Sequence, residues 1–201
     1  MRTAVTKNRY YEETLPEGYR EALAVDAGDG KLGARLAAVT MLTDSVLFAL
    51  LWFAYARPRM NELSAGFSVL KWLGLIAAYF LYISLHELAH GAVYKLLTKR
   101  KLTFGFKPPV AYCGVPGIYA YRITAMLSLA APLIVFSLLF AAAFFLVKDP
   151  FAKVLILILA VLHLSGCVGD LYGIGLFLFR FQDPAVLRLD TGPKQIYYTK
   201  D

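Results

Sequence analysis

Four apolar runs, each long enough to cross a lipid bilayer, constrain most strongly what this chain can fold into. About 20 apolar residues span the hydrocarbon core as a helix, because a helix satisfies its own backbone hydrogen bonds there. The composition agrees, since 59% of the 201 residues are hydrophobic and only 17% are charged, which is too apolar for an ordinary soluble domain. We therefore expect an all-α integral membrane protein with four transmembrane helices, at residues 36–56, 72–97, 123–147 and 154–179.

Basic residues outside the apolar runs predict the orientation. They gather in residues 1–35, in the loop between the second and third runs, and in the tail at residues 180–201. The positive-inside rule places these three segments in the cytoplasm. The net charge of +7 then indicates anionic lipid headgroups as the partner, and not nucleic acid. We expect a membrane domain at residues 36–179 in the bacterial cytoplasmic membrane, with both termini cytoplasmic.

The second run contains the sequence His-Glu-Leu-Ala-His at residues 86–90. His86 and His90 are four residues apart, so on a helix they share one face and can hold one metal ion. Glu87 lies beside them and can take a proton from an attacking water molecule. The alternative is a pair of histidines that only hydrogen-bond to neighbouring helices. Ionisable groups are costly inside a bilayer, which favours the metal site.

A catalytic zinc ion usually has three protein ligands. A helical rise of ~1.5 Å per residue puts Asp170 and Asp44 at roughly the depth of the two histidines, whereas His163 lies about 9 Å too deep. We take Asp170 as the third ligand. His163 shares a helix face with Asp170, so His163 and Asp44 are candidates for supporting contacts around the metal. Each acid has the alternative of a simple polar contact between helices.

Three segments resemble the intramembrane zincins of the DUF3267 type: HELAHG at 86–91, HLSGCVGD at 163–170 and LPEGY at 15–19. That family looks like a compact relative of the site-2 protease class, and the resemblance covers most of the chain. It implies Zn²⁺ held by His86, His90 and Asp170, with Glu87 as the catalytic acid and base. The sequence around the distal acid is Gly-Asp-Leu, which departs from the Asn-Pro-Asp-Gly or Leu-Asp-Gly pattern of site-2 proteases.

The loop between the second and third runs is predicted to be a short cytoplasmic hairpin. Leu102, Phe104 and Phe106 alternate with polar or small residues, which is the period of a strand. Pro108-Pro109 ends that strand, and residues 118–121 are expected to form a second one. Such a hairpin beside the metal can receive an extended substrate by strand addition. The alternative is an ordinary aromatic loop at the membrane surface.

Pro132 interrupts the third run. It removes one helix hydrogen bond and so frees the carbonyl group of Ser128. A kink at this position would widen a gap for access to the site. Simple helix packing is the alternative, because prolines are tolerated in membrane helices.

Together these features predict a zinc-dependent intramembrane peptidase that hydrolyses a peptide bond of a membrane-protein or peptide substrate. Two other classes stay open: a non-catalytic membrane metal-binding protein, such as a transporter or sensor, and an inactive adaptor with the same fold. A transporter should show inverted repeats or broken helices in both halves, and the sequence offers neither. A purely structural metal site would not need Glu87. The sequence does not indicate the oligomeric state.

Overall fold

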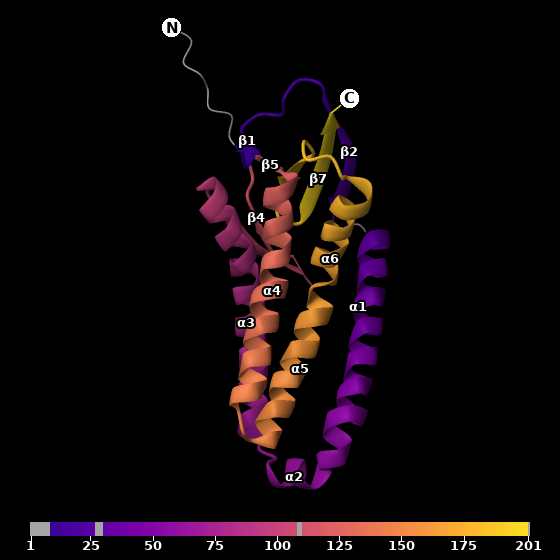
Figure 1. Ribbon diagram of the computed structural model, residues 1–201, viewed down its shortest axis with the longest axis vertical. Coiled ribbons are helices and arrows are strands. Elements are labelled where there is room, and N and C mark those ends of the chain that lie inside the picture. Colours follow the sequence, from indigo (N-terminus) through magenta and orange to yellow (C-terminus); the bar gives the residue numbers. More distant parts are fainter. Residues whose placement is uncertain (1–8, 27–29, 108–109, 201) are drawn as a thin grey trace.

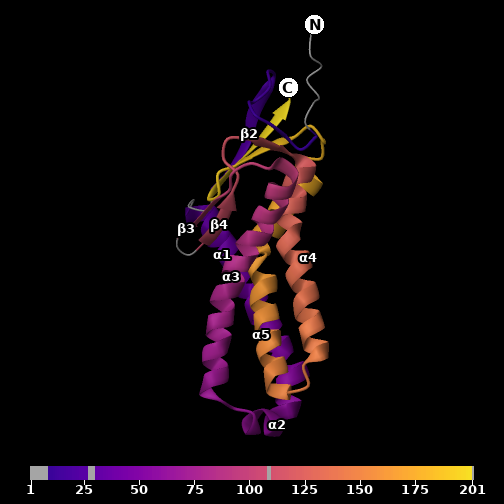
Figure 2. The same cartoon turned by 90° about the vertical axis from the view of Figure 1, so that its left-hand side faces the viewer.

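Long helices form a bundle that carries a β-sheet on one end (Figures 1 and 2). The computed structural model describes residues 9–26, 30–107 and 110–200. Its helices are α1 (Gly30–Leu51), α2 (Met60–Ala65), α3 (Val69–Thr98), α4 (Arg122–Leu146), α5 (Pro150–Gly166) and α6 (Val168–Gly175), with π-helical turns at Trp52–Ala56 and Leu176–Arg180 and a 3-10 turn at Arg57–Arg59. Its strands are β1 (Tyr11–Glu12), β2 (Tyr19–Asp26), β3 (Thr103–Lys107), β4 (Val110–Gly114), β5 (Tyr119–Tyr121), β6 (Leu187–Asp190) and β7 (Lys194–Lys200).

Four helical stretches are long and apolar enough to cross a membrane: Gly30–Ser64, Val69–Thr98, Arg122–Leu146 and Pro150–Arg180. They overlap the four predicted runs. Many of their apolar side chains face outward, and Phe80 and Phe145 are 66% and 80% exposed. A helix that is apolar all round needs apolar surroundings, and an exposed apolar surface of this extent would cause association in water. By length, composition and surface, these helices suit lipid.

The expectation of an all-α protein is wrong, because five antiparallel strands form a sheet in the order β1-β5-β6-β7-β2. Residues 1–35 supply β1 and β2, and residues 180–201 supply β6 and β7. These strands pair across almost the whole length of the chain, since Tyr19 lies opposite Lys200. Strand formation depends on such neighbours more than on local preference, so the separate segments carried little signal of a sheet.

The sheet and the adjoining helix ends share one hydrophobic core. Val25 of β2 and Tyr197 of β7 pack in the same buried cluster as Leu129 of α4 and Phe177 of the second π-helical turn. Tyr197 and Phe177 are completely buried. Burial of apolar surface is the main favourable term in such packing, so the sheet is a fixed part of the fold. It covers the end of the bundle opposite α2 (Figure 1).

The predicted hairpin exists, but its second strand was wrongly placed. Strand β3 pairs with β4 in a separate two-stranded sheet, with Phe104 opposite Cys113. Residues 118–121 instead contribute β5 to the five-stranded sheet. The predicted end of the first strand, Pro108-Pro109, lies outside the described residues. The hairpin lies against α3 at Gly91, where a Cβ atom would come within 2.9 Å of Leu102 and 3.0 Å of Cys113.

The fourth apolar run is two helices. Helix α5 ends at Gly166 and α6 begins at Val168, with Cys167 as the joint, whose N–H donates to the His163 carbonyl at 3.1 Å. Asp170 consequently lies in the first turn of α6. Helix α3 packs on α4 and α4 packs on α5, while α1 packs on α5 and α6 (Figures 1 and 2).

Candidate metal centre

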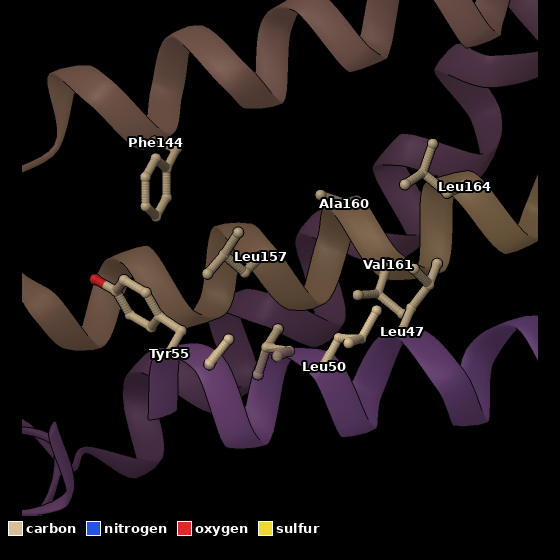
Figure 3. Close-up of a pocket in the computed structure, with 10 residues that line it drawn as sticks. Leu47, Leu50, Tyr55, Phe144, Leu157, Ala160, Val161 and Leu164 are labelled. Atoms are coloured by element: carbon tan, nitrogen blue, oxygen red, sulfur yellow. The ribbon is translucent and has the colours of Figure 1, made fainter. Parts of the chain in front are cut away.

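An apolar cavity of about 370 Å³ lies between α1 and α5 (Figure 3). Its walls include Leu47 and Leu50 of α1, Leu157 and Val161 of α5, and Phe144 of α4. The lining carries no carboxylate, imidazole or thiol. Chemistry in this protein therefore has to be sought where ionisable side chains meet, and that place lies between α3, α4 and α6.

Three predicted residues converge there. His86 Nε2 lies 3.3 Å from Asp170 Oδ2, and His90 Nε2 lies 3.3 Å from Asp170 Oδ1. Both histidines are buried, each with 8% of its surface exposed. The spacing of four residues on α3 turns both imidazoles to one side, and the break after α5 brings Asp170 to face them. The structure brings these three residues together, whereas Asp44, which the depth estimate placed at the same level, makes no ion pair or hydrogen bond with them among the described residues.

The geometry of this cluster fits a zinc ion. Two atoms that each lie ~2.1 Å from a tetrahedral zinc ion are ~3.4 Å apart, close to the two observed N···O separations of 3.3 Å. In addition, Asp170 Oδ2 is buried and has no hydrogen-bond partner among the described residues. A buried carboxylate oxygen without a partner is costly unless a cation is near. His86, His90 and Asp170 would hold the ion and leave a fourth position for water or substrate.

His90 is oriented by helix α4. Its Nδ1 lies 2.8 Å from the carbonyl oxygen of Ser128, and the Ser128 hydroxyl donates back to the His90 carbonyl at 3.2 Å. A carbonyl oxygen only accepts, so His90 Nδ1 carries the proton and donates it. The lone pair of Nε2 is then directed toward Asp170. Hydrogen bonds of this kind fix the ring of a metal-binding histidine and raise its basicity.

His86 is oriented by a tyrosine that the sequence analysis did not name. The Tyr82 hydroxyl lies 2.9 Å from His86 Nδ1 and also 2.9 Å from His163 Nδ1. His163 Nε2 lies 3.1 Å from the Ser137 hydroxyl, and the Cys167 thiol lies 3.7 Å from His163 Nδ1. His163 is therefore linked to a candidate ligand through Tyr82 and is not beside Asp170. A supporting role for His163 stays a prediction, and the contact with Tyr82 is the route by which it would act.

Glu87 lies beside the candidate ligands. Its carboxylate and one nitrogen of each neighbouring histidine lie within 4.8 Å of one another. The backbone amide of Cys113 in β4 faces this carboxylate. Glu87 is thus the second carboxylate of the site. The two Asp170 oxygens each face a different Nε2, an arrangement that favours Asp170 over Glu87 as the third ligand.

His86 also belongs to a second group of close ligand atoms, with His163 and Cys167. The hydrogen bonds that both imidazoles share with the Tyr82 hydroxyl account for their approach, so this group needs no second ion. Asp44 joins neither group. It lies on α1, and its Oδ1 atom is buried without a hydrogen-bond partner among the described residues.

The five-stranded sheet is joined to α3 just beyond the candidate ligands. Tyr94, one turn after His90, donates its hydroxyl to Asp190 Oδ2 at 3.0 Å. One guanidinium nitrogen of Arg188 lies 3.1 Å from the same oxygen. All three side chains are almost completely buried, and a buried ion pair with an added hydrogen bond is sensitive to position. Strand β6 therefore holds the ligand-bearing part of α3 in register.

A histidine pair on one helix turn, a carboxylate from a distant helix and an adjacent glutamate are the residue types from which zinc peptidase sites are built. Residues 79–184 match the model of the DUF3267 family, described as a putative zincin peptidase, and the chain belongs to this family. The matched region contains the candidate ligands, Glu87, Tyr82 and His163. Zinc is accordingly the cofactor that the family implies. No curated protein and no solved structure matches the chain.

Proposed function

We propose that the protein is an intramembrane zinc peptidase of the site-2 protease type, which hydrolyses a peptide bond of a membrane-protein substrate. The observation that carries the proposal is the approach of both His86 and His90 to Asp170 at 3.3 Å, with Glu87 beside them. The family description supports peptidase chemistry. The four long apolar helices support a site within the bilayer.

Zinc in this site would act as a Lewis acid toward the scissile carbonyl and would lower the pKa of the attacking water. Glu87 accepts a proton from that water while the water oxygen bonds to the carbonyl carbon. The C–N bond then breaks, and Glu87 returns the proton to the leaving amine, which leaves a carboxylate and an amine as products.

We propose further that β4 presents the substrate by strand addition. Strand β4 has β3 on one side and no other strand partner among the described residues. On its outer side the Cys113 amide faces Glu87, and the Val115 amide donates to the Asp190 carbonyl at 3.0 Å. Alternate residues of a strand point their amides to the same side, so the Ala111 amide also points outward. An extended substrate paired along this edge would lie beside Glu87.

The proposed orientation puts the sheet and both termini in the cytoplasm of a bacterium, and α2 outside. The sheet contains strands from both ends of the chain, and α2 lies at the opposite end of the bundle (Figure 1). Basic residues are concentrated in the segments that form the sheet end, which is the distribution of cytoplasmic segments. In this arrangement the bilayer surrounds the helices, and anionic headgroups lie near the sheet.

The test compares wild type with Glu87→Gln in cells that lack the native gene. Glutamine keeps the size of the side chain but cannot accept the proton, so cleavage should fall by ~10²–10⁴-fold or more, while zinc and fold are retained. Membrane-protein fragments are compared by quantitative proteomics. The matched control is Glu62→Gln on α2, where the same change falls on an exposed side chain far from the site and should leave cleavage unchanged.

A substrate cut equally by wild type and Glu87→Gln would refute the peptidase mechanism. If no fragment differs between the two strains and purified protein still binds zinc, the non-catalytic metal-binding protein becomes the better description. Loss of zinc from Glu87→Gln would make Glu87 a ligand and would reverse the roles proposed for Glu87 and Asp170.

A further inference from the structure

Pro132 lies in the middle of α4, on the side of the helix that is fully buried. Proline has no backbone N–H, so the carbonyl four residues earlier loses its helical partner. In α4 that carbonyl belongs to Ser128. In an apolar interior an unpaired carbonyl is costly, and prolines persist in such helices where a neighbouring group takes over the lost bond.

In this protein the group that takes over is a candidate zinc ligand. His90 Nδ1 lies 2.8 Å from the Ser128 carbonyl oxygen, which is a short and well-formed hydrogen bond. Because the carbonyl can only accept, this bond requires the proton of the neutral imidazole to be on Nδ1. Nε2 is then the unprotonated nitrogen, and it is the atom that lies 3.3 Å from Asp170 Oδ1.

We propose that Pro132 is a positioning residue for zinc: it frees the Ser128 carbonyl to orient His90. A residue with an N–H at position 132 would donate to Ser128 as in any regular helix and would compete with His90 for the same oxygen. The inference rests on the zinc site of the proposed function, but it concerns metal binding and not cleavage. It assigns a chemical task to a proline whose other explanation is helix packing.

The two explanations predict opposite patterns for Pro132→Ala. If the proline serves only packing, restoring the N–H should leave zinc affinity as it was. If it frees the carbonyl, the zinc-free protein should be at least as heat-stable as wild type, because the helix regains a bond, while zinc binding weakens. Loss of a hydrogen bond that orients a metal ligand costs ~10–100-fold in affinity, and we expect a loss in that range.

The experiment measures zinc affinity by chelator competition and melting temperature without zinc, on purified full-length protein in detergent. Pro132→Ala is compared with wild type and with Leu138→Ala, a control on the outward face of α4, where Leu138 is 66% exposed. The control should bind zinc as wild type does. A third protein carries lactic acid at position 132, an ester linkage that lacks the N–H as proline does but lacks the ring.

The expected result is weakened zinc binding in Pro132→Ala with unchanged or raised stability, and near wild-type binding in the ester protein. Wild-type affinity in Pro132→Ala would overturn the proposal, as would an ester protein weakened as much as Pro132→Ala. The zinc readout is independent of the peptidase assay. A protein that binds zinc in the expected pattern but cuts nothing would refute the proposed function and leave the role of Pro132 standing.

Discussion

Tyr82 and His163 are joined by a hydrogen bond of 2.9 Å between the Tyr82 hydroxyl and His163 Nδ1, although they lie on different helices, α3 and α5. The same hydroxyl lies 2.9 Å from Nδ1 of His86. A tyrosine hydroxyl has one proton to donate and also accepts. One of the two neutral imidazoles must therefore donate to Tyr82 and the other must accept from it.

The metal decides the direction of these bonds. If His86 binds zinc through Nε2, its proton is on Nδ1 and is donated to Tyr82. Tyr82 then donates to His163 Nδ1, which leaves the proton of His163 on Nε2, facing the Ser137 hydroxyl at 3.1 Å. A carbonyl of α4, that of Leu133, also interacts with this imidazole, and a carbonyl can only accept a proton. The contacts at both ends of the network thus require the same protonation.

Tyr82→Phe is predicted to weaken zinc binding while it preserves the fold. The ring keeps its packing against Phe136 and Phe140, but His86 and His163 lose their common partner. We expect a ~10–100-fold loss of zinc affinity, measured by chelator competition. Tyr79→Phe, three residues earlier on α3, removes the same hydroxyl from a ring that stacks on Tyr82 and is the control. Equal affinity in wild type and Tyr82→Phe would exclude an orienting role.

The three candidate ligands, His86, His90 and Asp170, predict the zinc content of the protein and its variants. Purified protein should contain about one zinc per chain, and His86→Ala, His90→Ala and Asp170→Ala should each lose it, as measured by elemental analysis. Asp44→Asn should retain it, because, unlike Asp170, Asp44 makes no ion pair or hydrogen bond with His86 or His90 among the described residues. If both histidine variants keep about one zinc per chain, His86 and His90 are not the zinc ligands. Zinc retained in Asp170→Ala alone would make Asp44 or His163 the third ligand.

The sequence located the long apolar helices and named His86, His90 and Asp170, which the structure places in contact. Length and hydropathy indicate the four candidate spans, and the helical rise per residue gives a depth for each position. These depths placed Asp170, and also Asp44, level with His86 and His90. Tyr82 was also within reach, since it lies four residues before His86 on the same helix face. Pro132 indicated a free carbonyl at Ser128, but not that His90 would take it, because that depends on how α3 and α4 pack.

The five-stranded sheet could not be predicted from the sequence, for a different reason. Strand β1 pairs through only two residues, and β2 finds its partner in β7 at the other end of the chain. No local pattern records such pairing, because the paired segments lie at opposite ends of the sequence and strand formation depends on the neighbouring strand. Strand β4 was not predicted either, since its residues Val110–Gly114 show no clear alternation of apolar and polar side chains.

Topology can be tested by cysteine labelling from outside intact cells. Single cysteines at Asn61 or Asp149 should react, and those at Lys101 or Lys194 should not. The native background should be low, because burial and the nearby Glu87 charge raise the pKa of the Cys113 thiol to about 12, and a protonated thiol reacts poorly. Cys167 is completely buried. The reverse labelling pattern would overturn the orientation and place the sheet outside the cell.

Asp149 should make stability depend on pH at the end of the bundle farthest from the sheet. Its pKa lies below the ordinary value of 3.8, because the Ala152 amide and Lys71 both hydrogen-bond to the carboxylate. A lowered pKa stabilises the fold above pH 3.8, and this contribution is lost as the pH falls through the folded-state pKa. The melting temperature of zinc-free wild type should exceed that of Asp149→Asn at neutral pH, with the difference shrinking below about pH 4. A difference independent of pH would contradict the assignment.

Ala111→Pro tests whether β4 presents the substrate. The Ala111 amide lies on the same side of the strand as that of Cys113, which faces Glu87, and proline removes this donor from an edge position where it does not disturb the pairing with β3. We expect slower cleavage, seen as a raised KM for the substrate identified by proteomics, with zinc content unchanged. Ala111→Val keeps the amide and is the matched control. Equal KM values for Ala111→Pro and wild type would show that the substrate does not pair with this edge, whereas zinc loss in Ala111→Pro would show that the hairpin supports the metal site itself.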